Sequence, residues 1–241
     1  SCSVNHMLDR LALSFDLQRQ FAGNAAHELR TPLAMMQTKL ELFTEEHSNV
    51  DAETSKLVQF QIDQVDRLTS LVRTLLEMSN LQSVSRSDEI ELAPLIDEIL
   101  TDLTTLAEQK NITLHQNCED VHMIGSDTLI YRLLFNLIEN AIKYNHSGGS
   151  VTVSMQQENQ QVLLHIADTG CGIPEEYRES IFQPFFRVDK SRSRQMGGVG
   201  LGLALVREIA VLHGGSVCVE SGSKDGTTFA VKLPLNGEKT E

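Results

Sequence analysis

The chain has 241 residues, 41% of them hydrophobic and 22% charged, a composition typical of a folded globular protein and not of a disordered one. Its formal net charge is −13, from 20 Lys and Arg against 33 Asp and Glu, which argues against nucleic-acid binding through a generally basic surface. No stretch approaches the roughly 18 consecutive apolar residues of a membrane-spanning helix, and no signal peptide opens the sequence.

The first helical region extends over residues from about 5 to 84 and contains one proline, Pro32, and one glycine, Gly23. Apolar residues in its first half recur in steps of three and four, which is the heptad pattern of a coiled-coil seam. The seam consists of Leu8, Leu11, Phe15, Ala22, Ala25, Leu29, Leu33, Met36, Leu40 and Phe43. An extra step of four coincides with Pro32, which predicts one irregular turn around residues 27–33.

A break near His47 separates this helix from a second one, predicted from about Asp51 to Leu81. The apolar seam of the second helix consists of Val58, Ile62, Val65, Leu68, Val72 and Leu75. Two amphipathic helices joined by a short loop form a hairpin, and a lone hairpin leaves its apolar stripe exposed to water. We therefore expect a homodimer in which two hairpins form a four-helix bundle.

Residues 82–88 are polar and are predicted to be a linker, after which short strands and helices are interspersed. The predicted strands are 89–92, 112–116, 121–124, 150–156, 161–167, 216–220 and 227–233. The predicted helices are 94–110, 127–144 and 201–213. This mixture favours a two-layer α+β domain.

The run AHELRTPL places His27 beside Glu28 and one helical turn before Thr31. At ~100° per residue, His27 points away from the apolar seam, so its imidazole is expected to be exposed. A neighbouring carboxylate can accept one ring proton and leave the other nitrogen free for nucleophilic attack. The pattern by itself also allows an ordinary solvated histidine.

Four polar residues, Asn136, Asn140, Lys143 and Tyr144, share one face of the predicted helix 127–144. Two carboxamides and an ammonium group in line could hold Mg²⁺ and phosphate oxygens, because Mg²⁺ prefers oxygen ligands and keeps several waters. An ordinary polar helix face is the alternative.

Two glycine-containing segments complete the candidate chemistry. Asp168 follows a strand and opens DTGCGIP. At this place a side chain can form hydrogen bonds to the edge of a base, and the glycines let the backbone approach a flat ligand. Common turns use the same residues. GGVGLGL at 197–203 opens a helix, which favours a phosphate site. The preceding residues 187–194 carry four basic side chains and one acidic one, within a region, 86–241, of net charge −9.

The glycine-rich segment does not fit the familiar nucleotide signatures. A dinucleotide fingerprint should follow a strand, and here a charged, serine-rich loop precedes the glycines. The P-loop pattern is absent, as are the catalytic-loop and DFG signatures of Ser/Thr and Tyr kinases.

Taken together and in this order, the motifs resemble those of the cytoplasmic portion of a bacterial sensor histidine kinase. The matching segments are AHELRTPL for the H-box, NLIENAIKY (136–144) for the N-box, DTGCGIP (168–174) for the G1 box, FQPFFR (182–187) for the F-box, GGVGLGLAL (197–205) for the G2 box and GTTF (226–229) for the last nucleotide-site element. The resemblance covers residues from about 5 to 235.

The resemblance implies an α-helical hairpin, paired as a dimeric four-helix bundle, followed by an α+β two-layer sandwich of the Bergerat fold that gyrase, Hsp90 and MutL share. Residues 1–18 would end a signalling helix entering from a HAMP domain, and 19–85 would be the dimerisation and histidine-phosphotransfer domain. Residues 86–235 would be the catalytic ATP-binding domain, and 236–241 a C-terminal tail. We expect this chain to be the cytoplasmic portion of a membrane sensor protein whose membrane and sensor parts lie outside it.

The resemblance also implies the site residues. His27 would be the phosphoacceptor, Glu28 its general base and Thr31 a residue of the phosphatase reaction. Asp168 would accept the adenine amino group, and Asn140 would hold Mg²⁺. The other implied ATP-binding residues are Asn136, Lys143, Tyr144, Gly170, Gly172, Ile173, Phe185, Arg187, Gly198, Gly200, Leu201, Gly202, Leu203, Thr227 and Thr228, with residues 187–199 as a lid over ATP.

The implied activity is autophosphorylation of His27 by ATP with Mg²⁺, followed by phosphoryl transfer to an aspartate in the receiver domain of a response regulator. Dephosphorylation of that regulator is the implied reverse activity. One alternative is a Bergerat-fold ATPase without histidine phosphorylation, which the N-box, G1 and G2 features fit equally well. The other is a non-catalytic scaffold. The H-box and the N-terminal heptads favour the kinase.

Overall fold

The computed structural model describes residues 23, 25, 26, 28–47, 51–188, 200–223 and 226–236. The chain divides into two compact units, with the main boundary between Gln82 and Ser83, three residues before the predicted one. Several predictions concern residues outside the described ranges: His27, Gly198, the segment 1–18, the seam residues before Gly23 and the tail after residue 236.

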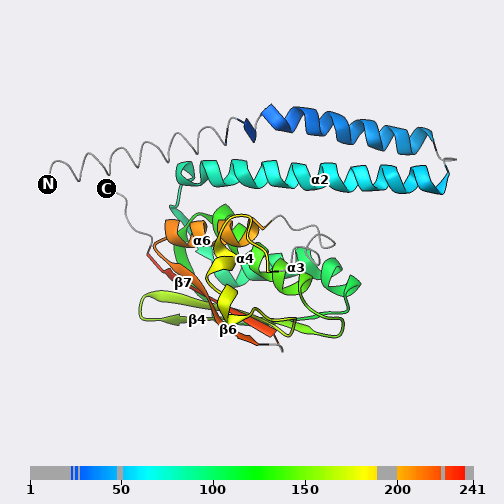
Figure 1. The fold of residues 1–241 in the computed structure, drawn as a ribbon. Coiled ribbons are helices and arrows are strands. Elements are labelled where there is room, and N and C mark those ends of the chain that lie inside the picture. The colour runs from blue at the N-terminus through cyan, green and yellow to red at the C-terminus, as the bar shows by residue number, and fades with distance from the viewer. Residues whose placement is uncertain are drawn as a thin grey trace. The chain divides into compact units, whose positions relative to one another are not determined.

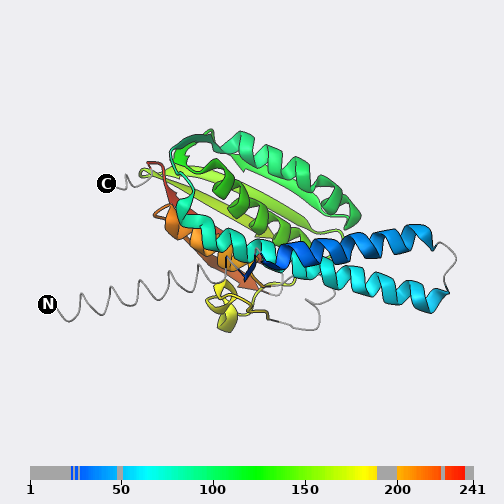
Figure 2. The same cartoon turned by 90° about the horizontal axis from the view of Figure 1, so that it is seen from above.

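The first unit is a helical hairpin. Residues 28–46 are helical, and α2 spans Ala52–Asn80 beside them. Both views of the ribbon show the two helices running antiparallel (Figures 1 and 2). The first helix continues through Pro32, whose ring nitrogen cannot donate to the carbonyl one turn earlier. Despite this missing donor, residues 28–46 are all helical, so the predicted irregular turn does not interrupt the helix from residue 28 onward.

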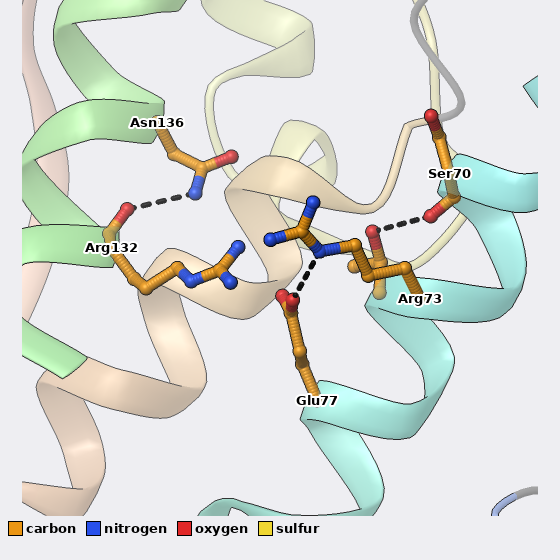
Figure 3. A network of polar contacts seen from close by, with 6 residues as sticks. Ser70, Arg73, Glu77, Arg132 and Asn136 are labelled. Carbon is orange, nitrogen blue, oxygen red and sulfur yellow. Dashed lines mark hydrogen bonds and ion pairs between the residues drawn. The ribbon is translucent and has the colours of Figure 1, made fainter. Parts of the chain in front are cut away.

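Local polar contacts explain where α2 starts, and an ion pair joins two successive turns further along it. One Asp51 carboxylate oxygen accepts hydrogen bonds from the backbone N–H groups of Glu53 (3.0 Å) and Thr54 (2.9 Å), as an N-cap residue does. Further along α2, Arg73 Nε lies 3.1 Å from Glu77 Oε1, one turn apart (Figure 3). Asp51 thereby fixes the beginning of α2 within one residue of the predicted position.

The hairpin buries only part of its apolar surface. Its buried cluster consists of Ala26, Leu33, Val65, Val72 and Leu76, with Leu40 and Leu75 packed against it. Three residues of the predicted seams remain exposed in the single chain: Leu29 (50%), Met36 (54%) and Leu68 (47%). This exposure is what the sequence predicts for one hairpin without a partner.

The second unit contains seven strands and three longer helices among its described residues. The strands are β1 (Asp88–Glu91), β2 (Thr113–Cys118), β3 (His122–Gly125), β4 (Ser150–Glu158), β5 (Gln161–Asp168), β6 (Ser216–Ser223) and β7 (Gly226–Pro234). The helices are α3 (Leu92–Gln109), α4 (Asp127–Lys143) and α6 (Gly202–Leu212), and the short 3-10 helices are η1 (Leu81–Ser83, at the boundary), η2 (Glu175–Tyr177) and η3 (Ser180–Phe182).

Five strands form the main sheet in the order β2-β4-β5-β7-β6, and β1 pairs with β3 in a separate two-stranded sheet. In the main sheet, β2 and β4 are parallel and the other neighbours antiparallel. Alternate residues of β4 and β5, such as Val153 and Ile166, are fully buried. The helices α3, α4 and α6 cover one face of this sheet (Figure 1), which confirms the predicted two-layer α+β architecture.

Side chains from other parts of the second unit bind both ends of helix α4. At its start, the N–H of Ser126 donates to His213 Nε2 (3.0 Å) and the N–H of Asp127 donates to Asp88 Oδ2 (3.2 Å). At its end, Lys110 Nζ donates to the carbonyl oxygens of the last turn. The helix that carries the candidate asparagines is thus bonded at both ends to other parts of the second unit.

No helix among the described residues combines the length and the apolar character that crossing a membrane requires.

Candidate functional site

Asp168 ends β5 with its side chain on the helix-covered face of the sheet. It pairs with Val151 of β4 and Thr227 of β7. Its Oδ1 accepts a hydrogen bond from the N–H of Gly170 (2.7 Å). Burial raises the pKa of this carboxyl, while hydrogen bonds from the backbone of Gly170 and Thr227 act in the opposite direction. The site therefore presents a half-buried hydrogen-bond acceptor held in one orientation.

The turn after Asp168 lies directly against the end of α4. A Cβ atom on Gly170 would lie 2.5 Å from the carbonyl oxygen of Tyr144 and 2.8 Å from Asp168 Oδ1. The same carbonyl accepts a hydrogen bond from the N–H of Cys171 (3.3 Å). Only glycine permits this approach, so it joins the turn to the α4 terminus.

The predicted polar face of α4 is present and partly exposed. Asn136, Asn140 and Lys143 lie on α4, and Tyr144 is its C-cap. The Nδ2 of Asn136 donates to the carbonyl of Arg132 (2.8 Å) (Figure 3). Lys143 Nζ lies 2.9 Å from Glu139 Oε1, one turn earlier.

The glycine-rich start of α6 lies beside this face. A Cβ atom on Gly202 would lie 2.7 Å from Asn136 Oδ1, so the helix start closely approaches the Asn136 side chain of α4. Gly200 has φ +80°, a left-handed conformation that favours glycine. Its carbonyl accepts a hydrogen bond from the N–H of Phe185 (2.8 Å), which ties the F-box loop to the start of α6.

The structure thus brings together most of the second unit's predicted site. Asp168 pairs with Thr227, Gly170 touches Tyr144, and Gly202 touches Asn136. Gly172, Ile173 and Arg187 lie in the described loops near these elements, while Leu201 and Leu203 flank Gly202.

Four further predicted site residues lie within the described ranges, two in each unit. Thr228 pairs with Ala167, so strand alternation turns its side chain to the opposite face from Thr227. Phe185 is 59% exposed and adopts φ +65°. In the first unit, Glu28 and Thr31 are both exposed on the first helix.

The chemistry of these groups fits a nucleotide better than other ligands. A fixed carboxylate acceptor suits an amino group on a base. The N-terminus of α6 presents unpaired N–H groups at the positive end of a helix dipole, which suits phosphate. The amide oxygens of Asn136 and Asn140 are of the donor class that Mg²⁺ accepts together with waters.

Comparison with known families agrees with this geometry. Residues 17–84 match the His Kinase A (phospho-acceptor) domain, and residues 125–237 match the histidine kinase-, DNA gyrase B- and HSP90-like ATPase domain. The chain belongs to the two-component histidine kinase family. The position of His27 falls within the first of these matches, and Asn140 and Asp168 fall within the second.

Curated histidine kinases match nearly the whole chain. Sensor histidine kinase RppB of Synechocystis sp. is 36% identical over 228 residues, which are 92% of this chain and 50% of that protein. Signal transduction histidine-protein kinase ArlS of Staphylococcus aureus is 35% identical over 237 residues, 95% of this chain and 51% of that protein. The chain therefore spans about half the length of these relatives.

Among solved structures, histidine kinase ThkA in complex with response regulator protein TrrA matches 96% of this chain and 64% of that one, with a TM-score of 0.65 and 25% identity. The helical hairpin and the sheet domain are therefore both present in a solved histidine kinase.

Sequence reasoning missed two polar residues whose side chains bond to each other within the candidate site. Asn145 follows the N-box, is only 8% exposed, and binds Thr169 and Ser150 through its side chain. Thr169 is the second residue of the G1 turn. Asn145 directly follows one motif and Thr169 lies within another, but nothing local indicates that their side chains, 24 residues apart in the sequence, meet.

Proposed function

We propose that the protein is a sensor histidine kinase that phosphorylates its own His27 with ATP and passes the phosphoryl group to an aspartate of a response regulator. The observation that carries the proposal is the presence, in one chain, of a phosphoacceptor-domain match containing His27 and an ATPase-domain match in which Asp168, α4 and the start of α6 converge. Neither a simple ATPase nor a scaffold accounts for both.

In this proposal Asp168 accepts a hydrogen bond from the 6-amino group of adenine. The glycines around Asp168 allow the base to lie against the backbone. The N–H groups at the start of α6 bind the phosphates, assisted by Lys143, which would exchange its contact with Glu139 for phosphate oxygens. Asn140, with Asn136 one turn before it, would hold Mg²⁺, which when bound neutralises phosphate charge.

The transfer step needs positioning more than covalent help. A lone pair on one imidazole nitrogen of His27 forms a bond to the γ-phosphorus, and the bond from that phosphorus to the bridging oxygen of ADP breaks. The proton on the other ring nitrogen passes to Glu28, which follows His27 in the sequence and is exposed on the first helix. The products are phosphohistidine and ADP.

The partner in the second step is proposed to be a receiver domain. ThkA, with 25% identity to this chain, was solved in complex with the response regulator TrrA, which supports a partner of the same class here. The aspartate of that domain would attack the phosphohistidine and release the imidazole. For the reverse, phosphatase reaction, we propose that Thr31 orients the attacking water.

Assembly and anchoring belong to the same proposal. The exposed Leu29, Met36 and Leu68 support a homodimer in which a second hairpin covers them. Since the curated relatives are about twice as long as this chain, we propose that the full protein is a membrane-anchored sensor and that residues 1–18 connect to its signalling part.

The test is incubation with γ-labelled ATP, with and without Mg²⁺, followed by addition of candidate receiver domains. We expect Mg²⁺-dependent labelling of the protein and movement of the label to a receiver domain. Release of labelled inorganic phosphate without any labelled protein would instead identify a Bergerat-fold ATPase.

A further inference from the structure

The side chain of Asn145 is a buried polar junction just beyond α4. Its Nδ2 donates to the carbonyl oxygen of Ser150 (2.9 Å). Its Oδ1 accepts from the N–H of His146 (3.0 Å) and from the hydroxyl of Thr169 (3.2 Å). Because both ends of the amide are used and the residue is 8% exposed, its orientation is fixed.

Thr169 extends the pairing of β4 and β5 by one step beyond Asp168. Its N–H donates to the carbonyl of Ser150 (3.2 Å), and its hydroxyl oxygen accepts from the N–H of Ser150 (2.9 Å). A Cβ on Gly149 would collide with Asn145 Oδ1 and lie 2.7 Å from Thr169 Oγ1, so the junction tolerates no side chain there. The hydroxyl thus replaces a backbone acceptor at the end of the sheet.

This junction adjoins the carboxylate proposed to bind adenine. Asp168 immediately precedes Thr169, and Gly170 follows it, with no space for a Cβ between itself and the end of α4. The N–H of Cys171 also binds the carbonyl of Tyr144. The backbone that follows Asp168 is therefore tied to the terminus of the helix that carries Asn140 and Lys143.

We propose that Asn145 and Thr169 are positioning residues that set the selectivity of the site for adenine, by holding the Asp168 carboxylate at a fixed place relative to the end of α4. This inference rests on the proposed function, in which Asp168 accepts the adenine amino group. Loss of the junction would let the carboxylate move relative to the phosphate-binding groups, so a ligand could no longer meet both at once.

The test compares the affinities for ATP and for inosine triphosphate, which has a carbonyl oxygen where adenine has its amino group and so has no donor at that position. We expect the unmodified protein to bind ATP about 10-fold more tightly or better. Thr169→Val, which keeps the side-chain shape and removes the hydroxyl, should reduce this ratio at least ~3-fold, mainly through weaker ATP binding. Thr169→Ser, which keeps the hydroxyl, should restore the ratio.

Thr152→Val is the matched control, because Thr152 lies on β4 but on the face of the sheet opposite to Val151 and Asp168. It should leave the ratio unchanged. Asn145→Ser serves as the second variant if Thr169→Val does not fold, and it should lower the ratio in the same way.

The outcomes separate the two levels of the proposal. If the unmodified protein discriminates but Thr169→Val and Asn145→Ser discriminate as well as it does, or weaken both ligands equally, the positioning role is wrong and the junction is only structural. If the unmodified protein binds both nucleotides equally well, or neither, the proposed role of Asp168 fails with it.

Discussion

At the scale of single residues, the ionisation of Asp168 governs the proposed recognition of adenine. Burial raises the pKa of Asp168 above its usual 3.8, but hydrogen bonds from the backbone of Gly170 and Thr227 stabilise the carboxylate. An ionised carboxylate is a stronger acceptor for the adenine amino group than a protonated carboxyl. ATP binding should therefore weaken as the pH falls through this raised pKa, when the carboxyl takes up a proton.

Asp168→Asn should weaken ATP binding by roughly 10- to 150-fold, because a hydrogen bond to a charged acceptor contributes about 1.5–3 kcal/mol. Isothermal calorimetry measures this directly. Asp120→Asn, at a strongly exposed side chain before β3, is the control and should bind ATP normally. An affinity for ATP that Asp168→Asn leaves unchanged would remove the adenine assignment.

Thr31→Ala should separate two activities. Autophosphorylation should persist within a few-fold, because His27 and Glu28 remain, while dephosphorylation of the regulator should fall much further, because the water loses its hydrogen-bonding partner. Alanine is the better helix former by several tenths of a kcal/mol, so helix propensity does not confuse the result.

Thr38→Ala is the control for Thr31→Ala, since Thr38 is also exposed and lies seven residues further along the same helix, where its hydroxyl donates to Ala34. Both rates and the melting temperature should be measured on each variant. A parallel loss of kinase and phosphatase activity with earlier melting would assign Thr31 to the helix around Pro32 instead of to the reaction.

At the scale of elements, the strands and helices of the second unit could be predicted from sequence because their patterns are local. Alternation in β5 and the 3.6-residue period of α6 gave bounds within two residues of those observed. The polar bonds that fix α4 could not be predicted, because His213 reaches Ser126 across 87 residues and Lys110 reaches Ile142 across 32. No local pattern encodes such contacts.

The same limit applies to the candidate site. The glycine and asparagine motifs indicated the site elements, and strand alternation could have separated Thr227 from Thr228. The junction of Asn145 and Thr169 depends on the start of β4 lying beside the end of β5, which only the folded sheet reveals.

His213 links α6 to α4 in its neutral form. Its Nε2 accepts from the N–H of Ser126, and its Nδ1, which must then carry the proton, donates to the carbonyl of Ile209 (2.8 Å). Burial lowers the pKa of His213 below 6.5, and the positive charge of Arg86 lowers it further, against the effect of the Ile209 carbonyl. The unfolded chain therefore binds this proton more readily than the folded one.

It follows that the free energy of unfolding falls as the pH drops below 6.5 and is unaffected by this group above it. His213→Gln should lower the stability of the second unit at pH 8 by about 1–3 kcal/mol and should flatten the pH dependence below 6.5. Thermal unfolding across this pH range measures both effects.

His115→Gln, at an exposed position on β2, is the matched control and should unfold like the unmodified protein. If His213→Gln and the unmodified protein lost stability equally on acidification, the linkage would lie in another group.

At the scale of the whole molecule, the chain separates the proposed acceptor from the proposed nucleotide site. The first unit contains the position of His27, and the second contains Asp168 and Asn140. A change confined to the acceptor should therefore leave nucleotide binding intact. In an ATPase that lacks a histidine acceptor, no labelling of the protein would depend on a residue of the first unit.

The most direct measurement is labelling of His27→Gln with γ-labelled ATP and Mg²⁺, alongside calorimetry of ATP binding and an acid/base stability test of the label. We predict that the unmodified protein carries a label that is lost in acid and survives base, as phosphohistidine does. His27→Gln should bind ATP normally and remain unlabelled. Label that persists on His27→Gln would contradict the account and move the acceptor to another residue.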